Sequence, residues 1–261
     1  MFSWIKKAFS RRGADPTFPS ELDTLIEISG VFGGKMADSE NACRKLYLEH
    51  ESEDHRYLRL TLDSAIAFLV AKMMLIKLEG KKATGKEVNK SYQIGLAASY
   101  IRTHHVLRTQ LQSGNLIESI LLARKQMESL ARFTELDSFT YESLKGKTPN
   151  IGKIKIAQIG RTYGFMSEHA HFGDIHTTEL LGSTLNEDRQ CRSPHVFPTF
   201  QPLAFKIFEA QSMLDLYFLS AMTSKFPTWD PDLNIDVIVG IGEKAARKAV
   251  EIGFVKVSEE A

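Results

Sequence analysis

The sequence predicts an all-α fold, a multi-helix bundle that carries a small mixed α/β tail at its C-terminal end. Apolar residues recur at intervals of three and four through most of the chain, which is the period of an amphipathic helix. Runs typical of strands occur only near the C-terminus, and most connections between helical segments are short. The 261 residues are 43% apolar and 25% charged, a mixture that excludes wholesale disorder.

The helical period defines a series of long segments in the body of the chain. Asn115 is the expected N-cap of one of them, and Pro202 is the expected first residue of another. The apolar stretch of the first of these segments, Ser64 to Ile76, is shorter than the roughly 20 residues that a spanning helix needs, so we expect a core helix there. The segments cover residues 56–79, 88–112, 115–136, 152–171 and 202–224.

Two parts of the chain depart from this pattern. Residues 173–200 contain prolines and glycines with little periodicity, which indicates a long irregular loop. In the tail, residues 235–239 and 254–257 indicate strands on either side of a basic helix. We therefore expect a basic amphipathic segment over residues 1–14, a helical domain over 20–226 and a C-terminal extension over 227–261.

The net charge of +1 is a sum of two unlike parts. The first twelve residues hold four basic side chains and no acidic one, so the rest of the chain carries −3 (29 basic against 32 acidic residues). A small negative charge argues against tight binding of nucleic acid by the body. The two cysteines, Cys43 and Cys191, are too few for a disulfide scaffold, which favours a reducing cytoplasm.

The N-terminal segment predicts a surface contact. A short basic amphipathic helix can lie in an anionic membrane interface with its aromatic side chains inserted. Alternatively, the helix packs on the body of the protein or on a partner subunit. The first alternative would place a cytoplasmic protein peripherally at the inner membrane face. The residues that would make either contact are Phe2, Trp4, Ile5, Lys6, Lys7, Phe9, Arg11 and Arg12.

Metal and cofactor motifs fail on inspection. His169, His171, Asp174 and His176 crowd together, but on one continuous helix the first two would point about 200° apart, so they could share a metal ion only if that helix ends early. A glycine-rich stretch near Gly33 lacks the spacing of a phosphate loop, and one at Gly240 leaves too little chain for a dinucleotide-binding domain. We expect neither a metal ion nor a cofactor.

Arg124 and Glu128 form the first half of a candidate site. On segment 115–136 both fall inside the apolar arc, whereas Gln126 and Arg132 fall outside it. A charged pair aimed inward is costly unless each partner is satisfied. The pair either ties two helices together or lines a polar pocket within the bundle.

Tyr163, Ser167 and His171 form the second half of the candidate site. They recur at i, i+4 and i+8, and so make a strip of two hydroxyls and an imidazole beside an apolar stripe. Packing of the two helices would bring this strip towards Arg124 and Glu128.

At these residues the chain resembles an uncharacterised family of bacterial helical proteins. That family carries an Arg-x-x-x-Glu motif on one helix and a Tyr-x-x-[Leu/Met]-Ser-x-x-[Ala/Val]-His motif on a later one. Arg124 and Glu128 match the first motif. The second is matched by Tyr163, Met166, Ser167, Ala170 and His171. The resemblance covers about residues 90–225.

A fainter similarity is to HEPN-like domains, which occur in toxin–antitoxin and phage-defence systems. In that superfamily an arginine and a nearby histidine act on the RNA 2′-hydroxyl and the scissile phosphate without a metal. Arg161 and His169 come nearest to this arrangement, but the seven residues between them are one too many for the pattern.

Two hypotheses follow for function. In the first, the chain is a HEPN-like protein of stress or phage defence that cleaves RNA, with His169 or His171 as acid/base and Arg161 or Arg124 stabilising phosphate charge. In the second, it is a non-catalytic interaction module that residues 1–12 recruit to a membrane or partner. A homodimer is compatible with either hypothesis.

Overall fold

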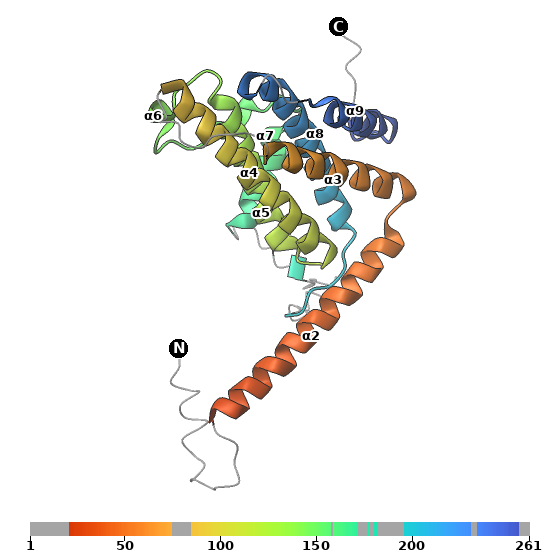
Figure 1. Ribbon diagram of the computed structural model, residues 1–261. Coiled ribbons are helices and arrows are strands. Elements are labelled where there is room, and N and C mark those ends of the chain that lie inside the picture. Colours follow the sequence, from red (N-terminus) through yellow and green to blue (C-terminus); the bar gives the residue numbers. More distant parts are fainter. Residues whose placement is uncertain are drawn as a thin grey trace.

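The computed structural model describes residues 21–74, 85–157, 159–171, 177, 180–181, 196–230 and 234–255. Over these residues the chain forms helices and no strand (Figure 1), which confirms the predicted all-α bundle. The helices are α2 (Glu21–His50), α3 (Glu53–Met73), α4 (Gly85–Gln112), α5 (Leu116–Glu135), α6 (Tyr141–Leu144), η1 (Ile151–Lys153), α7 (Ile159–Ala170), α8 (Leu203–Trp229) and α9 (Asp236–Glu251).

The boundaries differ from the predicted ones mainly where local turns compete with the helical period. The segment predicted over 152–171 is a single 3-10 turn followed by non-helical residues, and α7 begins only at Ile159. The Asn150 side chain accepts a hydrogen bond from Gly152 N at 3.0 Å and so fixes that turn. The N-terminal segment 1–14 and most of the predicted loop 173–200 lie outside the described residues.

The predicted mixed α/β tail is wrong over its first strand, because residues 236–239 form the first turn of α9. Ile238, Ala245 and Ala249 are fully buried and recur at helical spacing. Residues 236–239 therefore belong to a helix whose buried face packs on the bundle. The Asn234 side chain also accepts a hydrogen bond from Asp236 N at 2.9 Å, which supports the helix start. Phe254 and Val255 form a bend, and residues 256–257 lie outside the described part.

The described helices pack as one bundle around a shared apolar core. α4 and α5 form an antiparallel hairpin, α8 packs against both of them, and α9 lies against α3 and α8 (Figure 1). α7 lies on α5. α8 ends at Trp229 and so continues past residue 226, where the sequence predicts the end of the helical domain. α2 projects away from the bundle and contacts it with its C-terminal half (Figure 1). Within the described residues, no helix combines the length and the apolar character needed to cross a bilayer.

Gly114 makes the tight connection between α4 and α5. Its φ of 79° lies in the left-handed region, and Asn115 N donates to Gln110 O at 3.0 Å, as in a Schellman helix end. A Cβ at position 114 would come within 2.8 Å of Cys43 Sγ and 2.9 Å of Thr199 O. Asn115 is the N-cap residue of α5, as the sequence predicts, but its side chain makes no capping hydrogen bond, because its amide donates instead to Glu40 and Gln110.

A network of charged side chains lies inside the core and joins α4 to α8. Asp215 of α8 is completely buried. Its Oδ1 accepts from Tyr100 Oη at 2.9 Å and contacts His104 Nδ1 at 3.1 Å, while its Oδ2 accepts from Arg108 Nη2 at 3.3 Å. Tyr100, His104 and Arg108 recur at i, i+4 and i+8 on α4, so one face of that helix supplies all three partners.

The same network reaches α3 through Asp63. His104 Nε2 lies 3.0 Å from Asp63 Oδ1, and Arg108 Nε lies 3.5 Å from the same oxygen. Asp63 also lies 4.0 Å from the guanidinium of Arg59, which donates two hydrogen bonds to the buried Glu51 carboxylate. Asp63 and Asp215 thus hold His104 between three helices.

Each ring nitrogen of His104 faces a carboxylate, which favours the doubly protonated imidazolium. Burial by itself lowers the pKa of His104, but the charge of Asp215 and the hydrogen bonds to Asp215 and Asp63 outweigh it and raise the pKa. Burial raises the pKa of Asp63, but His104 and Arg108 outweigh that and lower it. Burial and the Asp215 charge raise the pKa of Tyr100, so its phenol stays a donor.

We predict that His104→Gln lowers the free energy of unfolding by about 3 kcal/mol at pH 6, because it removes the imidazolium between Asp63 and Asp215 and leaves Arg108 alone to balance both carboxylates. The folded-state pKa of His104 lies above its usual 6.5, so its contribution is complete below that pH and is lost as the pH rises through the folded-state value. Urea denaturation between pH 6 and 9 should show this loss in the parent protein and not in the variant.

The exposed neighbour His105 supplies the matched control, since His105→Gln removes an imidazole from the same helix outside the core. His105→Gln should retain both the parent stability and its pH dependence. An unchanged pH profile in His104→Gln would show that His104 is not the charged link.

Candidate functional site

The structure brings Arg124, Glu128 and Tyr163 together where α7 packs on α5. Glu128 Oε1 accepts two hydrogen bonds, from Arg124 Nε at 3.0 Å and from Tyr163 Oη at 2.8 Å. The guanidinium carbon of Arg124 lies 5.4 Å from the centroid of the Tyr163 ring, within the range of a cation–π contact. The carboxylate therefore holds the guanidinium and the phenol at fixed positions on two different helices.

His171 completes this group, which we call the Arg124 cluster (Arg124, Glu128, Tyr163 and His171). Arg124 Nη1 lies 2.8 Å from His171 Nε2. A guanidinium can only donate, so a hydrogen bond at this contact requires His171 Nε2 to be the acceptor. His171 follows the last residue of α7 and is exposed, while the Arg124 and Glu128 side chains are 21% and 32% exposed. The cluster is therefore open to solvent.

The electrostatics of the cluster keep its donors protonated. Partial burial and the hydrogen bond to Glu128 raise the pKa of Tyr163, so the phenol remains a donor. Burial lowers the pKa of Arg124, but its interactions with Tyr163 and Glu128 together outweigh this and raise it. The cluster thus presents a permanent cation beside an imidazole whose basic nitrogen is already hydrogen-bonded.

The other predicted site residues lie outside the cluster. His169 is buried, and its Nδ1 contacts Phe165 O of its own helix at 2.9 Å. Arg161 is exposed near the start of α7, so the structure does not pair it with His169. Ser167 is half-buried one turn before His171, and its side chain makes no hydrogen bond to the described cluster residues.

Two polar residues of α5 that the sequence predicts on the solvent side are buried. Gln126 donates to Tyr100 O at 3.4 Å, and Arg132 donates to the carbonyls of Leu144 and Lys147. α4 and the connection after α6 cover the flank of α5, which a helical wheel of one segment cannot show.

No group of three or more side chains suited to a metal ion occurs within the described ranges. Asp174 and His176 lie outside those ranges.

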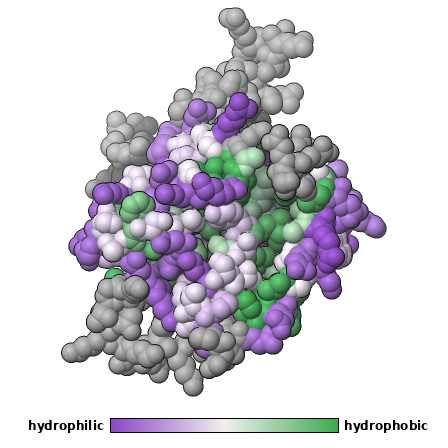
Figure 2. Space-filling view, turned by 90° about the horizontal axis from the view of Figure 1, so that it is seen from above, coloured by the Kyte–Doolittle hydropathy of each residue, from purple (hydrophilic) through white to green (hydrophobic). Residues whose placement is uncertain are grey.

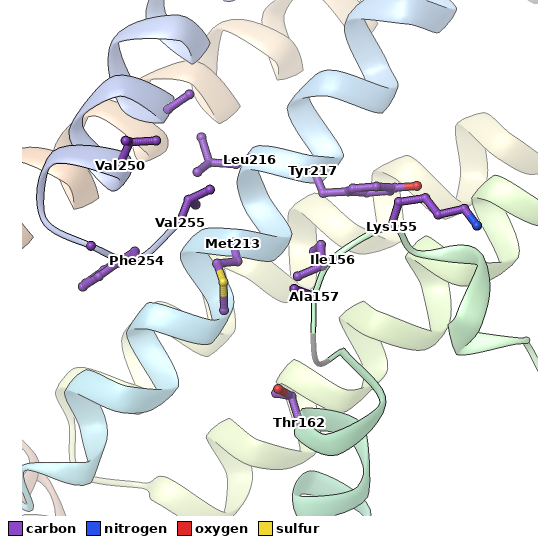
Figure 3. A pocket seen from close by; sticks show the side chains of 12 residues that line it. Lys155, Ile156, Ala157, Thr162, Met213, Leu216, Tyr217, Val250, Phe254 and Val255 are labelled. Carbon is purple, nitrogen blue, oxygen red and sulfur yellow. The ribbon is translucent and has the colours of Figure 1, made fainter. Parts of the chain in front are cut away.

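A separate groove of about 720 Å³ opens between α7, α8 and α9 (Figure 3). Met213 and Leu216 line it from α8, Val250 lines it from α9, and Val255 lines it from the residues that follow α9. Lys155 and Tyr217 lie side by side with their polar tips pointing the same way (Figure 3). Seen from above, the surface of the molecule carries apolar residues between hydrophilic ones (Figure 2). No member of the Arg124 cluster lines the groove, so the two features are distinct.

The network around Asp215 is the polar cluster that sequence reasoning missed. Its signal is the i, i+4, i+8 spacing of Tyr100, His104 and Arg108, together with an aspartate inside the apolar sequence of α8. A tyrosine at such a position also suits the apolar face of an ordinary core helix. The spacing alone therefore does not distinguish a buried polar network from apolar packing.

The comparisons assign no relative to this chain, since no family model, curated protein or solved structure matches it.

We predict that Arg124→Ala lowers the free energy of unfolding by less than about 1 kcal/mol, because partly exposed ion pairs contribute little to stability. Urea denaturation at pH 7 measures the change, with Lys125→Ala on the exposed side of α5 as the matched control. A loss of about 3 kcal/mol would instead make the Arg124 cluster a structural lock between α5 and α7.

Proposed function

We propose that the protein is a HEPN-like effector of stress or phage defence that cleaves RNA without a metal ion at the Arg124 cluster. The observation that carries the proposal is the 2.8 Å contact between Arg124 Nη1 and His171 Nε2 at a solvent-accessible position. It places a permanent cation directly beside an imidazole, the side chain that most often serves as a general acid or base. Those are the two components that cleavage next to a 2′-hydroxyl requires.

A bound phosphodiester would compete with His171 for the guanidinium. Once Arg124 donates to phosphate oxygens, His171 Nε2 is free to accept the 2′-hydroxyl proton. The 2′-oxygen then attacks phosphorus, the bond to the 5′-oxygen breaks, and that oxygen takes up a proton from water, while His171 returns the proton it accepted to solvent. The products are a 2′,3′-cyclic phosphate and a 5′-hydroxyl, and no oxidant or metal is consumed.

Glu128 and Tyr163 position the cation in this scheme. Glu128 holds Arg124 Nε from within the bundle, while the phenol of Tyr163 donates to the same carboxylate oxygen. Nη1 is left to face His171 and the substrate. Outside residues 1–12 the chain carries −3, so binding depends on few phosphate contacts and has a shallow salt dependence.

The test is incubation of the purified full-length protein with total RNA in EDTA. We expect cleavage to fall at least 100-fold in His171→Ala and in Arg124→Ala, since a positioned acid/base contributes about 10²–10⁴ to a rate. The parent products should carry 2′,3′-cyclic phosphates. Lys125→Ala removes a positive charge one residue away and should keep full activity.

A set of variants separates this site from the alternative pair on α7. Loss of cleavage in Arg161→Ala with full activity in Arg124→Ala would contradict the assignment. Absence of cleavage by the parent protein, with the fold verified by circular dichroism, would overturn the proposal of an RNA-cleaving effector.

The second candidate is a non-catalytic interaction module recruited to a membrane surface or a partner by residues 1–12. The groove between α7, α8 and α9 favours it, because an apolar concavity of this volume is of the size that accepts a ligand or a partner's side chains. In this alternative the Arg124 cluster only fixes the packing of α7 on α5.

We expect the full-length protein to sediment with phosphatidylglycerol vesicles if residues 1–12 recruit it to membranes, and to stay in the supernatant after their deletion. Neutral phosphatidylcholine vesicles and Lys6→Glu with Lys7→Glu are the controls, since both remove the electrostatic attraction. A full-length protein that never sediments would exclude recruitment to an anionic membrane.

A further inference from the structure

The N-terminal half of α2 exposes an apolar surface for which the described bundle offers little cover. Leu25, Ile28 and Phe32 are 54%, 57% and 47% exposed, and Ile26 and Val31 are similarly open. An isolated helix of this length has marginal stability in water, and most helices in proteins depend on the packing of an apolar face. This half of α2 therefore requires a cover.

The structure already provides one side of a docking site there. Phe197 packs against Phe32 with ring centroids 5.5 Å apart. Together with Ile28 and Val31 these rings border a pocket of about 500 Å³, with Glu27 and Lys35 also in its lining. The contacts of α2 with α4 and the α4–α5 turn begin only near Glu40 and Arg44, so the pocket lies on the projecting part of the helix (Figure 1).

We propose that residues 1–12 of the same chain cover this surface by docking antiparallel on α2 as the first arm of a helical hairpin. These residues lie outside the described ranges, and their sequence supplies the complementary pattern. Phe2, Ile5 and Phe9 recur at helical spacing, as do Leu25, Ile28 and Phe32. An antiparallel alignment sets Phe9 against Leu25, Ile5 against Ile28, and Phe2 against Phe32.

The charges of the two segments agree with that alignment. Lys6 comes level with Glu27, which borders the pocket on α2. Arg12 comes level with the first turns of α2, which contain Asp23. Lys35 lies beyond the end of the docked segment, so it opposes none of the four basic side chains of residues 1–12. Opposite charges flanking an apolar seam favour one register over its neighbours.

The connection between the two segments suits a hairpin. Residues 13–20 span at most about 28 Å when extended, well above the roughly 10 Å between the axes of packed helices. Gly13, Pro16 and Pro19 within the connection favour a turn over a continuous helix.

Docking gives residues 1–12 a second, competing use. Phe2, Ile5 and Phe9 would be buried against α2, and the same three side chains would have to enter a membrane interface. The docked and membrane-bound states are therefore mutually exclusive. The inference does not depend on the RNA-cleaving activity, because it concerns a different surface of the molecule.

Disulfide trapping in the full-length chain tests the docking. Ile5→Cys and Ile28→Cys are combined after Cys43 and Cys191 are replaced by alanine, and the parent fold is checked by circular dichroism. We expect the 5–28 disulfide to form within one chain at least tenfold faster than a 5–30 disulfide. Gly30→Cys is the matched control, because position 30 is unobstructed and points about 200° away from Ile28.

The charge pair supplies a second variant set in the same assay. Glu27→Lys should slow trapping several-fold, and adding Lys6→Glu should restore it. Equal trapping at positions 28 and 30, or no trapping at either, would overturn the inference. Disulfide-linked dimers in place of the intramolecular product would show that a second copy covers α2, which would also overturn it.

Discussion

The fold depends on a single buried carboxylate, that of Asp215 in the middle of α8. Removing a charge from water costs several kcal/mol even after the protein relaxes, so an aspartate at this position is tolerated only with matched partners. Tyr100, His104 and Arg108 supply them from one face of α4. The second ring nitrogen of His104 contacts Asp63, which connects the network to α3. This requirement favours one register of α4 against α8, because a shift between the two helices would leave the buried carboxylate without its partners.

The Arg124 cluster contains groups similar to those around Asp215, but it is open to solvent, whereas the Asp215 network is buried. Both clusters contain an arginine, a histidine, a tyrosine and a carboxylate. His104 is held between two carboxylates in the core and so has no freedom to exchange a proton without loss of stability. His171 is exposed and faces a guanidinium, so its basic nitrogen can be released when an anion occupies Arg124. Position relative to solvent and the sign of the neighbouring charge make the first cluster a structural link and the second a candidate site.

The helical periods predict the long core helices because each buries one continuous stripe, as Leu58, Leu62 and Leu69 do on α3. The tail shows where such reasoning stops. Four or five apolar residues fit a strand as well as a helix, and the contact of Ile238 with the bundle decides for the helix. The wheel of α5 places Arg124 and Glu128 near a neighbouring helix, but burial of Arg132 depends on a connection distant from that segment. The Asp215 network joins residues more than 100 positions apart, which no local pattern reveals.

The central claim is that two histidines have opposite hydrogen-bonding surroundings, His104 between two carboxylates and His171 beside a guanidinium. Long-range ¹H–¹⁵N correlation spectra of the histidine rings at pH 7, assigned with His104→Gln and His171→Ala, test it most directly. We predict that both ring nitrogens of His104 carry protons, whereas His171 is neutral with its proton on Nδ1. A neutral His104, or a His171 protonated at Nε2, would contradict the account.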